Sequence, residues 1–142
     1  RSAPAAPHLI ELRRQNALWL ATFRQLRSLS LEGESWQDAA AKLRQSILEQ
    51  LLHEERQIFP TVEKFLLSNR PTREMLYEHE GIRRFLPGLE EAIASRPGDR
   101  TWERFSLDLI HLLEHHIEHE ERGLYPLYER LVEGGKGDGQ VQ

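Results

Sequence analysis

The 142-residue sequence contains no cysteine. This absence excludes a disulfide framework, a thiolate zinc site, a cysteine-ligated iron–sulfur cluster and a thiol nucleophile. Basic residues are also in deficit, because 19 Lys and Arg stand against 23 Asp and Glu, so we expect no nucleic-acid partner. No apolar run approaches the ~18 residues of a membrane span, so we expect no membrane partner. Seven histidines and many carboxylates remain as the carriers of chemistry.

The two ends of the chain differ in composition from the middle. Residues 1–7 are small and proline-rich and lack the apolar core of a signal peptide, so we expect a flexible segment there. Residues 134–142 are glycine-rich and polar, and we expect a disordered tail. Neither end supports the expectation of a targeting signal, and a cytoplasmic location is the default expectation.

The middle of the chain contains an internal repeat. A shift of 66 residues places residues 35–60 on residues 101–126. The match is closest where His53-Glu54-Glu55-Arg56 meets His119-Glu120-Glu121-Arg122. A weaker similarity, at a shift of 63 residues, relates the other two apolar segments of the chain.

Apolar residues recur at helical spacing in all four segments, and the alternation typical of strands is absent. This pattern predicts helices at residues 8–29, 35–68, 72–95 and 101–133. We expect Pro60 and Pro126 to kink the second and fourth helices, and Pro87-Gly88 to break the third. Short connections favour antiparallel neighbours. The predicted fold is therefore all-α, an up-down-up-down antiparallel four-helix bundle over residues 8–133 with a pseudo-twofold repeat.

Each predicted helix carries polar residues within its apolar face, as placement at 100° per residue shows. These residues are Asn16, Gln50, Glu54, His79, His116 and Glu120. The repeats relate them in pairs, and a bundle would bring all six to one central pocket. The remaining histidines fall on or towards the polar side, where we expect a solvated face: His53, His111, His115 and His119. The tryptophans at 19, 36 and 102 are expected to pack in the core.

Two carboxylates in a bundle core need compensation, because removing an unpaired carboxylate from water costs several kcal/mol. A divalent cation held by two neutral imidazoles and two carboxylates is electrically neutral overall. The i,i+4 spacing of His116 and Glu120 places both side chains on one helix face. Such mixed nitrogen and oxygen donors suit iron, and also manganese or zinc. A metal-free alternative stays open, in which protonated His79 and His116 pair with the two carboxylates.

The sequence resembles the hemerythrin-like, or HHE cation-binding, family over nearly its whole length. The resemblance rests on His116-x-x-x-Glu120-Glu121-x-x-Leu124-Tyr125-Pro126, on Glu54-Glu55-x-x-Ile58-Phe59-Pro60, and on Glu78-His79 followed by Ile82-Arg83. It implies a four-helix bundle that holds a non-haem di-iron centre with bridging carboxylates. The family pattern has one His on the first helix, one on the third, and His-x-x-x-Glu on the second and fourth.

Two positions depart from this pattern. Asn16 stands where the first-helix His is expected, and Gln50 stands where the second-helix His is expected. The family pattern assigns those two His to the same iron. We therefore expect one metal ion rather than two, held by Glu54, His79, His116 and Glu120. The second position, near Asn16 and Gln50, is then empty, water-filled or weakly held, and the two amides offer oxygens or hydrogen-bond to the carboxylates.

Three classes of function stay open. The first is a metal-binding domain, with iron as the cofactor, that senses oxygen, nitric oxide or peroxide or handles iron. The second is a helical interaction or sensor module with a vestigial, metal-free site. The third is an enzyme acting at the metal, although the chain shows no Ser-His-Asp set, phosphate loop or nucleotide motif. The sequence does not determine the oligomeric state.

Overall fold

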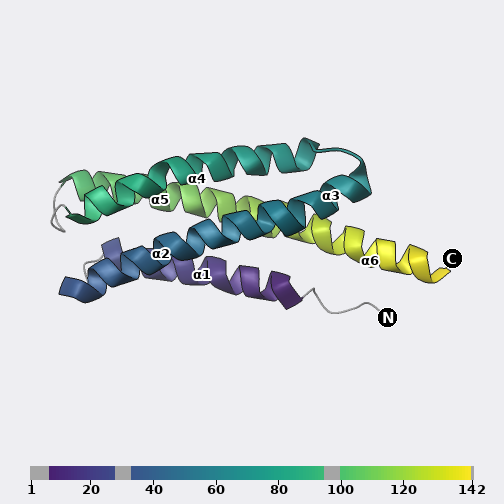
Figure 1. The fold of residues 1–142 in the computed structure, drawn as a ribbon, viewed down its shortest axis with the longest axis horizontal. Helices are drawn as coiled ribbons and strands as arrows, with labels where there is room; N and C mark the ends of the chain where they lie inside the picture. The colour runs from purple at the N-terminus through teal and green to yellow at the C-terminus, as the bar shows by residue number, and fades with distance from the viewer. Residues whose placement is uncertain (1–6, 28–32, 95–99, 142) are drawn as a thin grey trace.

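The computed structural model describes residues 7–27, 33–94 and 100–141, which are helical except for a short connection at 67–69 (Figure 1). Two of the helical segments are single π-helical turns, labelled η1 and η2. The elements in chain order are α1 (Pro7–Arg27), α2 (Gly33–His53), η1 (Glu54–Ile58), α3 (Phe59–Leu66), α4 (Arg70–Ala94), α5 (Arg100–His119), η2 (Glu120–Leu124) and α6 (Tyr125–Val141). The described residues contain no strand, in agreement with the predicted all-α class.

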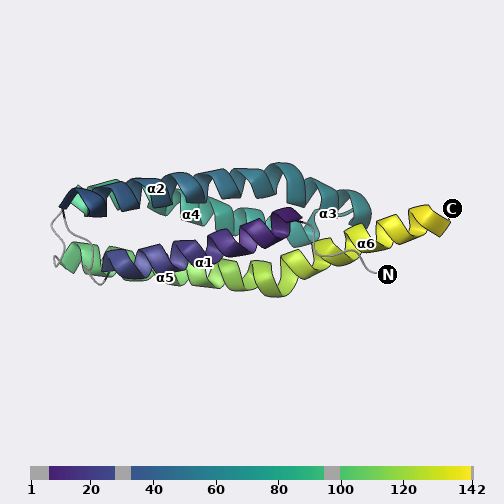
Figure 2. The same cartoon turned by 90° about the horizontal axis from the view of Figure 1, so that it is seen from below.

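The elements form four long helical rods, because α2, η1 and α3 are continuous, as are α5, η2 and α6. Successive rods run in alternating directions along the long axis (Figure 1). α1 packs against α2 and α5, and α4 packs against the same two helices, so the rods enclose one core. Seen from below, α6 continues beyond the end of α3 (Figure 2). The four-helix bundle is thereby confirmed, while an exact pseudo-twofold relation stays a prediction.

The predicted helix ends that fall on described residues lie within two residues of the observed ends, except at the C-terminus, and the ends predicted at 29 and 95 lie outside the described residues. There α6 continues to Val141, beyond the end predicted at residue 133, and the disorder expected over residues 134–142 stays a prediction. Residues 1–6 of the expected flexible segment lie outside the described residues, and Pro7 already belongs to α1.

The expected break at Pro87-Gly88 was wrong, because Pro87 lies inside the continuous helix α4. A proline ring cannot donate a backbone hydrogen bond and leaves one carbonyl without its helical partner. Pro87 is on the exposed face, where water can bond to that carbonyl. Leu86 and Leu89, on either side of it, are buried and hold both halves of the helix against the bundle.

The core consists of two hydrophobic clusters that lie at different heights along the bundle. One cluster surrounds Trp19, Phe23 and Trp102, and the other contains Leu9, Ile58, Phe59 and Tyr125. In every rod one or two buried polar residues lie where one cluster gives way to the other, whereas the buried Thr72 and Ser106 lie away from this layer. The described buried residues of this polar layer are Asn16, Gln50, Glu54, His79, His116 and Glu120. All six sequence-predicted residues therefore lie within the bundle core.

Candidate metal centre

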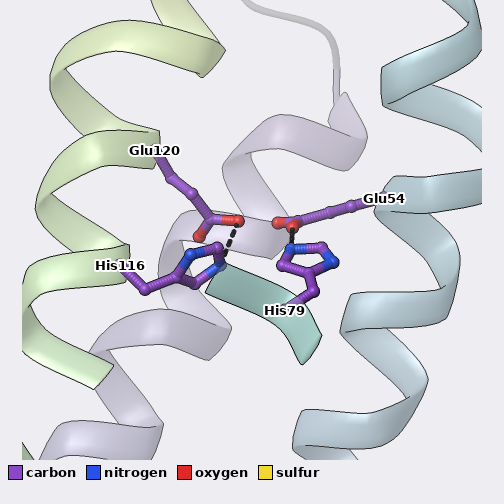
Figure 3. A group of neighbouring side chains, drawn as sticks. All are labelled: Glu54, His79, His116 and Glu120. Atoms are coloured by element: carbon purple, nitrogen blue, oxygen red, sulfur yellow. Dashed lines mark hydrogen bonds and ion pairs between the residues drawn. The ribbon is translucent and has the colours of Figure 1, made fainter. Parts of the chain in front are cut away.

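The structure brings the two carboxylates and two imidazoles of the polar layer together. Glu54, His79, His116 and Glu120 all have 0% exposure. Each offers one donor atom, and these four atoms all lie within 4.8 Å of one another. The side chains enter from four separate elements, η1, α4, α5 and η2, and point towards a common centre (Figure 3). Sequence reasoning selected these four residues as ligands, and the fold places them in one cluster.

The cluster consists of two carboxylate–imidazole pairs. Nε2 of His79 lies 3.0 Å from Oε1 of Glu54, across two helices. Nε2 of His116 lies 3.0 Å from Oε2 of Glu120, one helical turn along the same rod. The two imidazole rings meet edge to face, with centroids 4.8 Å apart. At these distances, each Nε2 atom and its carboxylate oxygen require a proton or a cation between the nitrogen and the oxygen.

A π-helical turn begins at each of the two glutamates. The N–H of Phe59 bonds to the carbonyl of Glu54, and the N–H of Tyr125 bonds to the carbonyl of Glu120. A π turn contains one residue more than an α turn and often occurs at functional sites. The added residue changes the helical phase, so Phe59 and Tyr125 are buried directly after a buried neighbour. The simple kinks expected at Pro60 and Pro126 are therefore widened turns that end just before each proline.

An outer carboxylate orients each imidazole. Nδ1 of His79 donates to Oε2 of Glu55 at 2.7 Å, and Arg83 forms an ion pair with the same carboxylate. Nδ1 of His116 donates to Oε1 of Glu78 at 2.8 Å. Such partners set the tautomer and ring orientation of metal-ligating histidines. With Nδ1 protonated, a neutral imidazole presents the lone pair of Nε2 to the centre of the cluster.

Asn16 and Gln50 form an amide pair beside the carboxylates. Nε2 of Gln50 donates to Oδ1 of Asn16 at 2.7 Å and, less closely, to Oε2 of Glu54 at 3.5 Å. Nδ2 of Asn16 donates to Oε1 of Glu120 at 3.2 Å. The amide oxygen of Asn16 is thus engaged by Gln50, and amide N–H groups face both carboxylates. Of the two roles expected for these amides, the geometry is that of hydrogen bonding to the carboxylates.

Tyr125 is a member of the site that sequence reasoning missed. Its ring is fully buried, and its hydroxyl donates to Oε2 of Glu54 at 2.5 Å. Burial and the two nearby carboxylates raise the pKa of Tyr125 well above its ordinary value, so the phenol stays protonated. The repeat offered one signal, because Tyr125 aligns with Phe59 and only one of the two copies carries a hydroxyl.

Burial and the charges of neighbouring groups shift the pKa values of the metal-free cluster. Burial and then the negative charge of Glu120 raise the pKa of Glu54 to about 8. Burial lowers the pKa of His116, but the charge of Glu120 and the hydrogen bond to Glu78 outweigh it and raise this pKa to about 10. For Glu120, burial is outweighed by the charge of His116, so its pKa lies below its ordinary value. Without a cation, protons therefore neutralise the cluster.

The donor set fits a divalent cation. Nε2 of His116 and Oε2 of Glu120 are both buried and lie 3.0 Å apart as an ion pair, but neither atom forms a hydrogen bond of regular geometry. Buried polar atoms without a regular hydrogen bond cost free energy and require an explanation, such as an ion. Two imidazoles and two carboxylates match the donors preferred by iron, manganese or zinc, and two ionised carboxylates balance the charge of the cation. The four residues at the centre of the polar layer thus form a candidate metal site.

Comparison with known proteins places this geometry in a family. The model of the hemerythrin HHE cation-binding domain matches residues 9–128 of the chain. The chain belongs to the hemerythrin HHE cation-binding domain family. No curated protein and no solved structure matches the chain significantly. The family expected from sequence motifs is therefore confirmed, and cation binding is the property that its description states.

A surface groove of about 340 Å³ between α1 and α2 is lined in part by Gln50 and His53, so it reaches one edge of the polar layer. His53 is half-buried in this groove and does not belong to the four-residue cluster.

Within the described residues, no helix has the length and apolar character needed to span a membrane. A cytoplasmic location stays a prediction.

Proposed function

We propose that this domain binds a single metal ion, iron, through Glu54, His79, His116 and Glu120. The observation that carries the proposal is the convergence of these four fully buried side chains, which leaves two polar atoms without a regular hydrogen bond. Membership of a cation-binding family supports it. The structure of the outer hydrogen bonds supports it further, because each imidazole is already oriented by a carboxylate.

The amide pair favours one metal rather than two. In the family pattern that the sequence resembles, Asn16 and Gln50 occupy the two histidine positions that serve one iron. A second cation beside Glu54 and Glu120 would need lone pairs from the residues at these two positions. The amides instead direct N–H groups towards both carboxylates. The oxygen of Asn16 already accepts a hydrogen bond from Gln50. The amides thus take over the carboxylate oxygens that a second metal would use.

The proposed role is sensing of oxygen, nitric oxide or peroxide, or the handling of iron. A bound iron would supply redox chemistry and coordination positions for a small ligand beyond the four protein donors. Tyr125 and Gln50 both donate hydrogen bonds to Oε2 of Glu54, the oxygen that does not face His79, and hold this carboxylate in place. The groove that reaches Gln50 and His53 offers small molecules an approach to this edge of the layer. Reversible oxygen carriage by an iron pair does not match a site with half of the histidines replaced.

A second candidate is a metal-free interaction or sensor module. The observation in its favour is that protons can close the cluster, through the His79–Glu54 contact and the His116–Glu120 ion pair. A metal that binds the folded state raises the melting temperature by mass action, whereas a vestigial site does not respond. Thermal melting with and without added Fe²⁺ therefore separates the two candidates.

Metal counting tests the proposal directly. Chelator-treated protein titrated with Fe²⁺ without oxygen is expected to bind one ion per chain, and His116→Gln is expected to lose it. The double variant Asn16→His/Gln50→His restores the missing imidazoles and is expected to bind two. Gln45→His, at an exposed position of α2, is the control and should leave the count at one. Two tightly held ions that both persist in His119→Ala would contradict the single-metal proposal for the core, and none would favour the metal-free module.

A further inference from the structure

A second cluster of potential ligands lies at the surface, between α4 and α5. Glu78 of α4 and His115 and His119 of α5 each offer a donor atom, and these atoms all lie within 4.8 Å of one another. Nδ1 of His119 is 2.5 Å from Oε2 of Glu78, and Nε2 of His115 is 3.6 Å from the same oxygen. The sequence predicted only a solvated face for these two histidines. The structure shows that they share one carboxylate across the helix pair.

The two histidines present their rings side by side. His115 and His119 are one helical turn apart, and their ring centroids are separated by 4.4 Å. Their side chains are 63% and 44% exposed, so both can be reached by an ion from solvent. Two histidines at i,i+4 on one helix are a recurrent chelating pair for zinc. Two such imidazoles and a carboxylate, with a position left for water, match a three-ligand zinc site.

The carboxylate of Glu78 is held in place before any ion binds. Its side chain is only 12% exposed. Oε1 accepts the hydrogen bond from Nδ1 of His116 at 2.8 Å, which leaves Oε2 turned towards His115 and His119. A ligand fixed in this way loses little freedom when it binds a cation.

We propose that Glu78, His115 and His119 form a second metal site, at the surface, for a divalent transition cation such as Zn²⁺. Its three residues are distinct from the four residues of the core cluster. Glu78 links the two, because one of its oxygens faces the surface site and the other bonds to His116 of the core.

Zn²⁺ alone, titrated calorimetrically into the chelator-treated full chain, tests the proposal. Apart from any Zn²⁺ bound in the core, we expect one binding event that His115→Ala and His119→Ala each remove. The matched control is His111→Ala, because His111 is exposed and also one turn from His115, but it does not belong to the cluster with Glu78. Circular dichroism checks that the helices remain. If both variants bind Zn²⁺ as the unmodified chain does, or if His111→Ala loses the event equally, the proposal is overturned.

Zn²⁺ bound in the core is told apart by a further variant. Glu54→Gln removes a core donor and does not touch the surface cluster. The surface event is expected to persist in Glu54→Gln and to disappear in His119→Ala, whatever the core does. An event lost only in Glu54→Gln belongs to the core, and if no other event is found the surface site is refuted while the core proposal stands.

Discussion

Replacing Tyr125 by phenylalanine isolates the contribution of one hydroxyl to the metal centre. The ring is fully buried, and Phe keeps its packing while removing the donor to Oε2 of Glu54. In the metal-free protein the pKa of Glu54 is about 8, so at pH 7 the lost hydrogen bond joins two neutral groups. Such a bond contributes about 0.5–1.5 kcal/mol to the free energy of unfolding.

Metal binding changes the magnitude, because it requires Glu54 to be ionised. A hydrogen bond to a charged group contributes about 1.5–3 kcal/mol. Tyr125→Phe is therefore expected to cost roughly 1–1.5 kcal/mol more in the metal-bound protein than in the metal-free protein. Because binding and unfolding are linked, this difference lowers the affinity for the metal, and about 1.4 kcal/mol corresponds to a tenfold larger dissociation constant. We thus expect about tenfold weaker binding, at the lower end of the roughly 10–100-fold effects of groups that support metal ligands.

Two measurements check this expectation. Urea denaturation of the metal-free protein gives the loss in unfolding free energy, and competition with a chelator for Fe²⁺ gives the loss in affinity. Tyr128→Phe is the control, because Tyr128 is buried in the same hydrophobic cluster and its replacement also removes one phenolic hydroxyl. If Tyr125→Phe lowers stability but leaves the metal affinity unchanged, the hydroxyl does not act through a metal-bound Glu54 and the reasoning fails.

Two further predictions concern stability without metal. The pKa of Glu54 is raised from 4.5 to about 8 on folding, so its stabilising effect is complete below 4.5 and is lost as the pH rises through 8. The unfolding free energy of the metal-free protein should therefore fall between pH 5 and pH 9. In Glu54→Gln it should fall less steeply. The slope that remains in this variant comes from His116, because the pKa of His116 is raised from 6.5 to about 10. A flat profile in urea denaturation would contradict this assignment. Gly88→Ala should destabilise by about 1–3 kcal/mol through overpacking, because its Cβ would lie 2.7 Å from Phe105. Gly81→Ala, with nothing within 4 Å of its Cβ, should instead stabilise α4 by up to about 1 kcal/mol; equal melting shifts in the two variants would refute the packing argument.

Helical periodicity explains why the four central residues could be found in the sequence. A residue inside an apolar stripe has to face the core of any bundle built from that helix. This holds for His79 in α4 and for the pair His116 and Glu120 in α5 and η2, whatever the helix crossing angles are. The same local reasoning failed at Pro87, because buried neighbours on both sides hold the helix together in spite of the proline.

The sequence by itself determined the helices, the bundle and the six polar residues of the central layer, since each follows from the spacing of side chains along one helix. Only the tertiary structure decided which polar atoms meet. Tyr125 reaches Glu54 because the π turn at Glu120 changes the helical phase by one residue. Glu78 serves both His116 and His119 because α4 and α5 pack side by side. Contacts of this kind depend on the rotation and approach of neighbouring helices, which the periodicity of a single helix does not specify.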